Sequence, residues 1–179
     1  MLSPLHSGVV IFPREVGDQN MQNEIIPKTH LKEFARRLRA TKKKIVFTNG
    51  VFDILHAGHV DYLTRARKLG DVLVVGLNTD ASVKQNKGDL RPIIPYKYRA
   101  QMLIALRVVD YVMPLDEKTP AKLIEMIAPD VLVKGADYKL TEIVGADFVL
   151  AHGGTVVRMK LLKGLSTSWV LERIRKAMK

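Results

Sequence analysis

The sequence contains no cysteine, and this absence excludes disulfide bonds, thiolate metal ligands and a cysteine nucleophile. It also lacks a long hydrophobic run: the longest apolar stretches, such as residues 71–77, have the length of a strand, far short of the ~20 residues that cross a bilayer. No basic segment precedes the short apolar stretch that ends at Pro13, so no signal peptide is expected. These absences predict a cytoplasmic protein with no membrane partner.

The middle of the chain lacks a charge excess, although the formal net charge is +11. Residues 1–44 carry nine basic and four acidic side chains, residues 158–179 carry seven and one, and residues 45–157 carry 13 of each. A protein that coats DNA or RNA usually spreads basic residues over its folded body. The distribution therefore argues against a nucleic-acid partner.

The 179 residues are enough for one domain, and the hydrophobic fraction of 47% is ordinary for a protein with a core. Residues 1–27 show no sustained period and contain several prolines and glycines, which predicts a loose N-terminal extension. Residues 28–179 are expected to form a single domain. Its first helix is expected after Pro27, because Leu31 and Leu38 share one apolar face.

From Lys44 onward, short runs of Val and Ile alternate with stretches of helical spacing. Apolar runs of this kind predict strands covered on both faces, and the alternation predicts an α/β fold with a doubly wound parallel sheet of five strands. With the strand order 3-2-1-4-5, ligands would bind where Thr48-Asn-Gly and Lys134-Gly leave the first and fourth strands. The expected strands are 45–48, 72–77, 111–113, 131–133 and 155–158, and the expected helices are 58–68, 96–106, 120–127, 143–151 and 168–178.

The segment 48–59 carries the most specific chemistry in the chain. Gly50 directly follows a predicted strand and would let the backbone approach an anion closely. His56 and His59 lie three residues apart around a helix start, where free N–H groups favour phosphate, and the glycine before His59 leaves room for a ligand. The histidines could instead cap the helix or bind zinc. Because zinc needs a third ligand and only Asp53 lies nearby, no metal site is expected.

The composite pattern Gly-x-Phe-Asp-x-x-His-x-Gly-His, residues 50–59, resembles the signature of the HxGH nucleotidyltransferase superfamily, and most closely its cytidylyltransferase-like group. A second segment, Lys163-Gly-Leu-Ser-Thr-Ser168, is similar to the Arg/Lys-Gly-Ile-Ser-Thr-Thr/Ser segment of that group. Its hydroxyls precede the last predicted helix and could either form a second phosphate site or only cap that helix. The resemblance implies the Rossmann-like fold of the superfamily.

From about Leu31 to the C-terminus, the chain also resembles the adenylyltransferase half of bacterial ADP-heptose synthase. This resemblance implies a stand-alone enzyme without the accompanying sugar-kinase half. Such an enzyme transfers AMP from ATP to D-glycero-β-D-manno-heptose 1-phosphate for lipopolysaccharide or S-layer sugar supply. Ala136 replaces a frequent glycine near the expected nucleotide pocket, which leaves the base preference open. The segments that carry the resemblance are 78–80, 87–92, 109–111, 119–120, 129–138 and 143–146.

In the implied reaction, a sugar-phosphate oxygen attacks the α-phosphorus of ATP and pyrophosphate leaves. The nucleophile is already an anion, so alignment and charge neutralisation would supply the catalysis. The expected cofactor is Mg²⁺, bound mainly through the ATP phosphates. The expected catalytic residues are His56, His59 and Lys87, the last of them in a long loop after the second strand.

The implied binding residues fall into two groups. The nucleotide-binding group is Thr48, Asn49, Gly50, Phe52, Gly58, Lys134, Gly135, Lys163, Ser166, Thr167 and Ser168. The substrate-binding group is Asp53, Asp80, Arg91, Arg99, Asp137 and Tyr138. Within it, Arg91 and Arg99 could grip the acceptor phosphate, and Asp53 is expected to orient its own loop by accepting backbone N–H bonds.

Two other functions remain open at this point. A cytidylyl- or guanylyltransferase would apply the same chemistry to another small phosphate, such as glycerol 3-phosphate. A non-catalytic protein that binds nucleotide or nucleic acid could retain the fold; the basic ends favour this weakly, and the intact histidine pair opposes it. ATP and a sugar 1-phosphate are the expected small-molecule partners, and a homo-oligomer, a dimer or higher, is expected.

Overall fold

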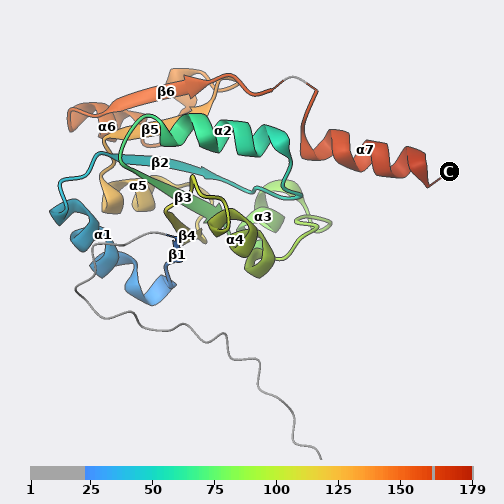
Figure 1. Cartoon of the computed structure of the whole chain (residues 1–179), viewed down its shortest axis with the longest axis horizontal. Coiled ribbons are helices and arrows are strands. Elements are labelled where there is room, and N and C mark those ends of the chain that lie inside the picture. The colour runs from blue at the N-terminus through green and yellow to red at the C-terminus, as the bar shows by residue number, and fades with distance from the viewer. Residues whose placement is uncertain (1–22, 163, 179) are drawn as a thin grey trace, which may run out of the picture.

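The computed structural model describes residues 23–162 and 164–178, in which one parallel sheet carries helices on both faces (Figure 1). The strand order is β1-β4-β3-β2-β5-β6. The strands are β1 (Glu24–Ile25), β2 (Ile45–Gly50), β3 (Val72–Asn78), β4 (Tyr111–Leu115), β5 (Val131–Gly135) and β6 (Thr155–Met159). The helices are α1 (Leu31–Ala40), α2 (Ala57–Arg67), α3 (Asp80–Lys87), α4 (Tyr96–Ile104), α5 (Ala121–Ile127), α6 (Ala146–Ala151) and α7 (Thr167–Ala177), with 3-10 turns η1 (Lys28–His30) and η2 (Leu140–Glu142).

The strands bury alternate side chains in two cores on opposite faces of the sheet, as strand geometry requires. In β2, Ile45 and Phe47 pack in the core under α1, α5 and α6, whereas Val46 packs in the core under α2 and α4. In β3, Val74 lies in the first core and Val75 in the second. Because both faces are covered, the strands carry uninterrupted Val and Ile runs.

The predicted α/β fold with a doubly wound parallel sheet is confirmed, and the predicted order 3-2-1-4-5 corresponds to β4-β3-β2-β5-β6. Strand β2 pairs with β3 on one side and with β5 on the other. The chain therefore winds outward in both directions from β2. The strand order reverses beside β2 and β5, and their carboxyl ends border the place where such sheets bind ligands.

The sheet has six strands rather than five, because Glu24–Ile25 form a short edge strand beside β4. The amide of Ile26 donates to the carbonyl of Val112 at 2.9 Å, and the Ile26 side chain is 2% exposed. This segment therefore belongs to the folded body, although the sequence predicts a loose extension over residues 1–27. A two-residue strand has no periodic pattern to detect. The rest of the expected extension, residues 1–22, lies outside the described residues.

Shortening Ile26 to valine is expected to lower the free energy of unfolding by about 0.5–1.5 kcal/mol, because a buried methylene leaves the core. Ile25 offers a matched control, since it is adjacent and only partly buried. Its change to valine should have a smaller effect in urea unfolding followed by circular dichroism. Equal effects would contradict the anchoring of this edge segment through Ile26.

Helix α3 carries Lys87 as its last residue, whereas the sequence pattern places this lysine in a long loop. Only Ser82 and Val83 of the helix are buried, so the sequence shows no apolar face. Its ends have capping features instead: the Thr79 hydroxyl accepts from the Ser82 amide, and the helix stops at Gly88 with φ 87°. Lys87 is therefore attached to regular structure rather than to a free loop.

Helix α7 extends away from the sheet (Figure 1) and contributes no buried residue. Its apolar side chains Trp169 and Ile174 are exposed. No helix in the described part of the chain is long and apolar enough to cross a membrane.

Candidate active site

A cavity of about 670 Å³ opens at the carboxyl ends of β2, β3 and β5. This volume is in the range of small-ligand sites, which are roughly 300–1,000 Å³. The segments after β4 and before α7 complete its wall. The structure brings together in this wall the predicted residues Asn49, Gly50, Phe52, Asp53, His56, Gly58, His59, Lys87, Arg91, Lys134, Gly135, Asp137, Tyr138, Ser166, Thr167 and Ser168.

The two histidines stack against each other at the start of α2. Their ring centroids are 3.8 Å apart and their planes differ by 21°. Both ring nitrogens of His56 and Nδ1 of His59 are buried without a hydrogen-bond partner, and the His56 side chain does not cap the helix. Buried polar groups without a partner are costly, so these nitrogens favour a ligand that supplies acceptor atoms.

The environment of the two histidines favours their neutral form. Burial lowers the pKa of His56, and burial together with the neighbouring His56 lowers the pKa of His59 to about 4. A neutral imidazole carries one N–H donor, so the pair can donate two hydrogen bonds to one ligand at the N-terminus of α2. Together with the dipole of that helix, this arrangement suits an anion.

The histidine loop, residues 50–56, shapes the pair through backbone geometry. Phe52 and Ile54 have left-handed φ angles of 47° and 51°, which are uncommon for large side chains and mark a strained turn. The Phe52 ring then meets His59 edge to face at 5.2 Å. A Cβ at Gly58 would lie 3.0 Å from the His56 ring, so a larger residue here would require that ring to move by a few tenths of an ångström.

The second sequence motif contacts the first directly. The Thr167 hydroxyl donates to the Asp53 carbonyl at 2.7 Å, across 114 residues of sequence. Ser166 caps α7 by accepting from the amide of Trp169 at 3.1 Å. Ser166 therefore has the capping role that was one of the two alternatives, while its position in the cavity wall leaves the phosphate role open. Lys163 lies outside the described residues.

A partly buried lysine lies on the β5 side of the cavity. Burial lowers the pKa of Lys134 to about 8, against the opposing effect of Asp137. Its Nζ donates to Oδ1 of Asn49 and lies 5.8 Å from the centre of the Tyr138 ring. The side chain is thus held in place. Because its pKa lies close to neutral pH, a bound anion beside it would favour the charged form, and a bound cation would favour the neutral form.

Asp53 is placed differently from its predicted substrate-binding role. Its carboxylate is 1% exposed and accepts from Nε of Arg91 and from the amides of Ile93 and Ile94, all at 2.8–2.9 Å. Burial alone would raise the pKa of Asp53, but these three donors outweigh it and hold the pKa below its usual value. The carboxylate therefore fastens the α3–α4 loop, residues 88–95, and is not free for a ligand.

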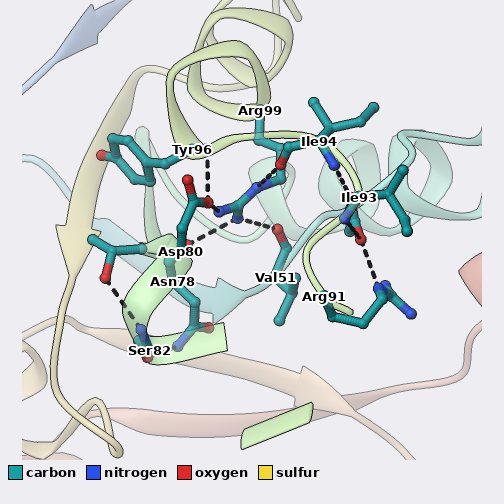
Figure 2. A network of polar contacts seen from close by, with 11 residues as sticks. Val51, Asn78, Asp80, Ser82, Arg91, Ile93, Ile94, Tyr96 and Arg99 are labelled. Carbon is teal, nitrogen blue, oxygen red and sulfur yellow. Dashed lines mark hydrogen bonds and ion pairs between the residues drawn. The ribbon is translucent and has the colours of Figure 1, made fainter. Parts of the chain in front are cut away.

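Three further predicted residues are used inside the protein and do not line the cavity. Arg99 is fully buried and donates to three carbonyls and to Asp80, as Figure 2 shows. Asp80 also accepts from the amide of Tyr96 at 2.8 Å. The hydroxyl of Thr48 bonds to the Tyr62 hydroxyl at 2.8 Å and donates to a β5 carbonyl. These bonds occupy the Arg99 guanidinium, the Thr48 hydroxyl and one carboxylate oxygen of Asp80, and the predicted contacts of the three residues with substrate or nucleotide remain predictions.

One cationic residue of the cavity wall, Lys118, is not among the residues predicted from the sequence. Lys118 lies three residues after the end of β4 and lines the cavity together with Asn78, Asn86 and Thr119. Within the described part of the chain, the side chains of Lys118 and Lys87 have no hydrogen bond or ion pair. The available signal is the run of charged residues 116–118, shortly after the third predicted strand. The cavity thus has two lysines whose charge no protein group neutralises.

The comparison with family descriptions matches residues 47–173 to the cytidylyltransferase-like model. The chain is also 55% identical over 132 residues to the bifunctional protein HldE of Citrifermentans bemidjiense, which covers 74% of this chain and 27% of that protein. It is 58% identical over 136 residues to HldE of Campylobacter concisus, covering 76% of this chain and 28% of that protein. The chain therefore spans less than a third of the length of these curated relatives.

Two solved structures are also similar to this chain. The crystal structure of a lipopolysaccharide core biosynthesis protein from Thermoplasma volcanium superimposes with a TM-score of 0.56 at 33% identity, covering 68% of this chain and 99% of that chain. A pantoate-β-alanine ligase from Francisella tularensis, at 17% identity and a TM-score of 0.57, covers 85% of this chain and 76% of that chain and shares the fold. The relationship predicted from the two motifs is confirmed: the chain belongs to the cytidylyltransferase-like family of nucleotidyltransferases.

Proposed function

We propose that this chain transfers AMP from ATP to D-glycero-β-D-manno-heptose 1-phosphate and releases pyrophosphate. The observation that carries the proposal is the stacked pair His56 and His59, whose buried nitrogens lack partners at a helix N-terminus inside the cavity. Phosphate oxygens supply the acceptors that these donors need. The choice of sugar rests on the relatives named HldE and on the resemblance to the adenylyltransferase half of ADP-heptose synthase.

The nucleotide would lie on the β5 side of the cavity. Lys134 and Gly135 leave β5 there, and the segment that begins α7 supplies hydroxyl groups and backbone N–H groups at Ser166, Thr167 and Ser168. The phosphates would then run toward the histidine pair, which follows β2 in the middle of the sheet.

The acceptor would lie on the opposite side of β2. Arg91 lines the cavity and donates from Nε to Asp53. Its two Nη groups therefore remain available for a phosphate. Lys87 and Lys118 provide the uncompensated positive charge that two incoming phosphorylated substrates require. In this proposal they take the place of Arg99, one of the two arginines that the sequence offers for the acceptor phosphate.

Catalysis would proceed by in-line attack of the acceptor phosphate on the α-phosphorus. No general base is needed, because the nucleophile is already ionised. The histidines would donate hydrogen bonds to oxygens whose negative charge grows in the five-coordinate state, and Lys87 and Lys118 would neutralise the charge of the approaching acceptor phosphate.

The substrate in this proposal is MgATP, with the ion held mainly by the phosphates. Among the described residues, no group of three or more His, Asp or Glu side chains is arranged to hold a metal. Asp53 is the only carboxylate beside the histidine pair in the motif, and its oxygens are already bonded to Arg91 and two amides. Phosphate and water oxygens would therefore provide most of the ligands, as Mg²⁺ commonly prefers.

A homo-oligomer remains part of the proposal. The exposed apolar residues Trp169 and Ile174 on a helix that extends from the body support it. Sedimentation analysis measures the assembly state directly.

The proposed reaction is tested by measuring pyrophosphate release with ATP, CTP and GTP against the two anomers of heptose 1-phosphate and glycerol 3-phosphate. Rapid release with only ATP and the β-anomer is expected. Preference for CTP or GTP, or for glycerol 3-phosphate, would instead support a cytidylyl- or guanylyltransferase that acts on another small phosphate. Salt-sensitive binding to DNA or RNA with no pyrophosphate released by any pair would favour a non-catalytic binding protein.

Binding of ATP is expected to take up protons at mildly acidic pH. The pKa of His59 is about 4 in the free protein, and a triphosphate beside the pair raises the pKa of both histidines toward the working pH. Calorimetry at pH 6 in buffers of different ionisation enthalpy measures the protons absorbed. Uptake should be smaller in His59→Ala than in the unaltered protein, since proton release from ATP itself is common to both. Equal uptake would place the triphosphate away from the histidines.

A further inference from the structure

Arg99, on helix α4, is a buried cation. Its hydrogen bonds reach several different segments around the site. Its side chain is 0% exposed. Nε donates to the Ile94 carbonyl at 2.8 Å, and Nη1 donates to the carbonyls of Val51 at 2.7 Å and Asn78 at 2.8 Å. Nη2 donates to Oδ1 of Asp80 at 2.6 Å (Figure 2). One guanidinium therefore joins the histidine loop, the end of β3, the start of α3 and the α3–α4 loop.

The bond to Val51 acts on the histidine pair. Val51 precedes Phe52, the residue with φ 47° whose ring meets His59 edge to face at 5.2 Å. Orienting the Val51 carbonyl fixes the peptide plane that leads into Phe52. Arg99 thereby determines where the Phe52 ring supports His59, although it touches neither ring of the pair.

The bond to Asp80 acts on the lysine of α3. Asp80 is the first residue of this helix and Lys87 is the last. Asp80 also accepts from the Tyr96 amide, so it joins the start of α3 to the start of α4. The position of Lys87 relative to the histidine loop therefore depends on the Asp80–Arg99 ion pair.

The bond to Ile94 acts on the arginine of the α3–α4 loop. The Ile94 carbonyl accepts from Arg99, while its amide donates to Asp53 at 2.9 Å. Asp53 also holds Arg91 through Nε at 2.8 Å. The loop that carries Arg91 is thus fixed from both sides to the histidine loop, by a buried cation and a buried carboxylate.

An ion pair that buries its cation, as Arg99 is buried here beside the partly exposed Asp80, is a poor way to gain stability, because desolvation of the cation offsets much of the attraction. What an arginine offers here is geometry, since its planar group presents five donors in fixed directions and a lysine has only three. We propose that Arg99, together with Asp80, is a positioning residue for nucleotidyl transfer. It fixes the positions of the histidine pair, Lys87 and Arg91 relative to one another without touching substrate. This inference rests on the proposed function.

The test compares Arg99→Lys and Asp80→Asn with the control Lys97→Met, an exposed residue of the same helix outside the cavity wall. Asp80→Asn keeps an oxygen that can accept from Arg99 and the Tyr96 amide, so it is the variant least able to disturb folding. For each protein, kcat, both KM values and the melting temperature are measured below the onset of melting.

Positioning predicts that kcat falls by about 10–10² and that KM for the acceptor rises in both variants, because reacting groups are displaced by a fraction of an ångström. KM for ATP should change little, since the proposed nucleotide contacts on β5 and α7 are not joined to Arg99. Lys97→Met should resemble the unaltered protein. If Arg99→Lys does not fold, Asp80→Asn alone decides.

A lower melting temperature with unchanged kcat and acceptor KM would overturn the inference, and so would a rise confined to KM for ATP. An unaltered protein that releases no pyrophosphate with any substrate pair would refute the proposed function instead. The imidazole NMR signals of His56 and His59 provide a readout without substrate. They should shift in Arg99→Lys and Asp80→Asn but not in Lys97→Met, and unshifted signals would count against positioning.

Discussion

Replacing His59 with alanine is expected to lower kcat by about 10²–10³, equivalent to roughly 2.7–4 kcal/mol, with a smaller change in KM for ATP. The reason is that charge on the α-phosphate oxygens grows in the transition state, so a hydrogen bond from His59 is worth more there than in the ground state. Initial rates over a range of ATP concentrations separate the two constants. His59→Asn should recover part of the loss, because an amide can still donate.

Adding His56→Ala to His59→Ala should cost less than the two single losses multiplied, because both side chains act on one charge. His152 provides the control: it is exposed and bonds to the Phe148 carbonyl at 2.8 Å, remote from the cavity wall. His152→Ala should retain full turnover. Normal kcat with a lowered melting temperature in His59→Ala would mean that the pair is structural, and the proposed mechanism would be wrong.

Replacing Asp53 with alanine is expected to lower the free energy of unfolding by about 3–5 kcal/mol, because it leaves Arg91 and two amides without their buried acceptor. The pKa of Asp53 is lowered in the folded protein, so the carboxylate contributes stability at neutral pH. That contribution is lost as the pH falls below the ordinary value of 3.8 and through the folded value. Urea unfolding at pH 7 and at pH 3 measures both effects.

Asp61 is the matched control for this second experiment. It also bonds to an arginine, Arg65, at 2.7 Å, but both side chains are about one-third exposed on the surface of α2. Exposed pairs of this kind contribute about 0–1 kcal/mol, so Asp61→Ala should have a small effect. Similar losses in the two variants would contradict the special role of the Asp53 cluster.

The sheet order and the centre of the site could be predicted because each is written in a local pattern. Uninterrupted Val and Ile runs indicate strands buried on both faces, and their alternation with helices permits few topologies. The spacing of His56 and His59 around Gly58 indicates a helix start, and the structure shows the two rings stacked there. The link between the motifs, through Thr167 and Asp53, could be anticipated only from the family resemblance.

The remaining features could not be predicted, because sequence position does not show where a charge points. Arg99 and Asp80 look like free charges near strand ends, yet Arg99 is fully buried and its guanidinium is bonded to the partly exposed carboxylate of Asp80. Thr48 follows the buried apolar residues of β2, but its hydroxyl is bonded to the Tyr62 hydroxyl and donates to a β5 carbonyl. Lys118 lies next to an unremarkable Asp-Glu pair and is placed in the cavity wall by the packing of β4 against β3.

The contact of Thr167 with the carbonyl of Asp53 means that the last helix completes the cavity wall although it contributes no buried residue. Among the described residues, every buried one lies at or before Met159, while α7 buries none. A chain that stops just before Ser166 would therefore keep the described core and lose one wall of its substrate cavity. A truncation at this position is expected to separate folding, which persists, from activity, which is lost.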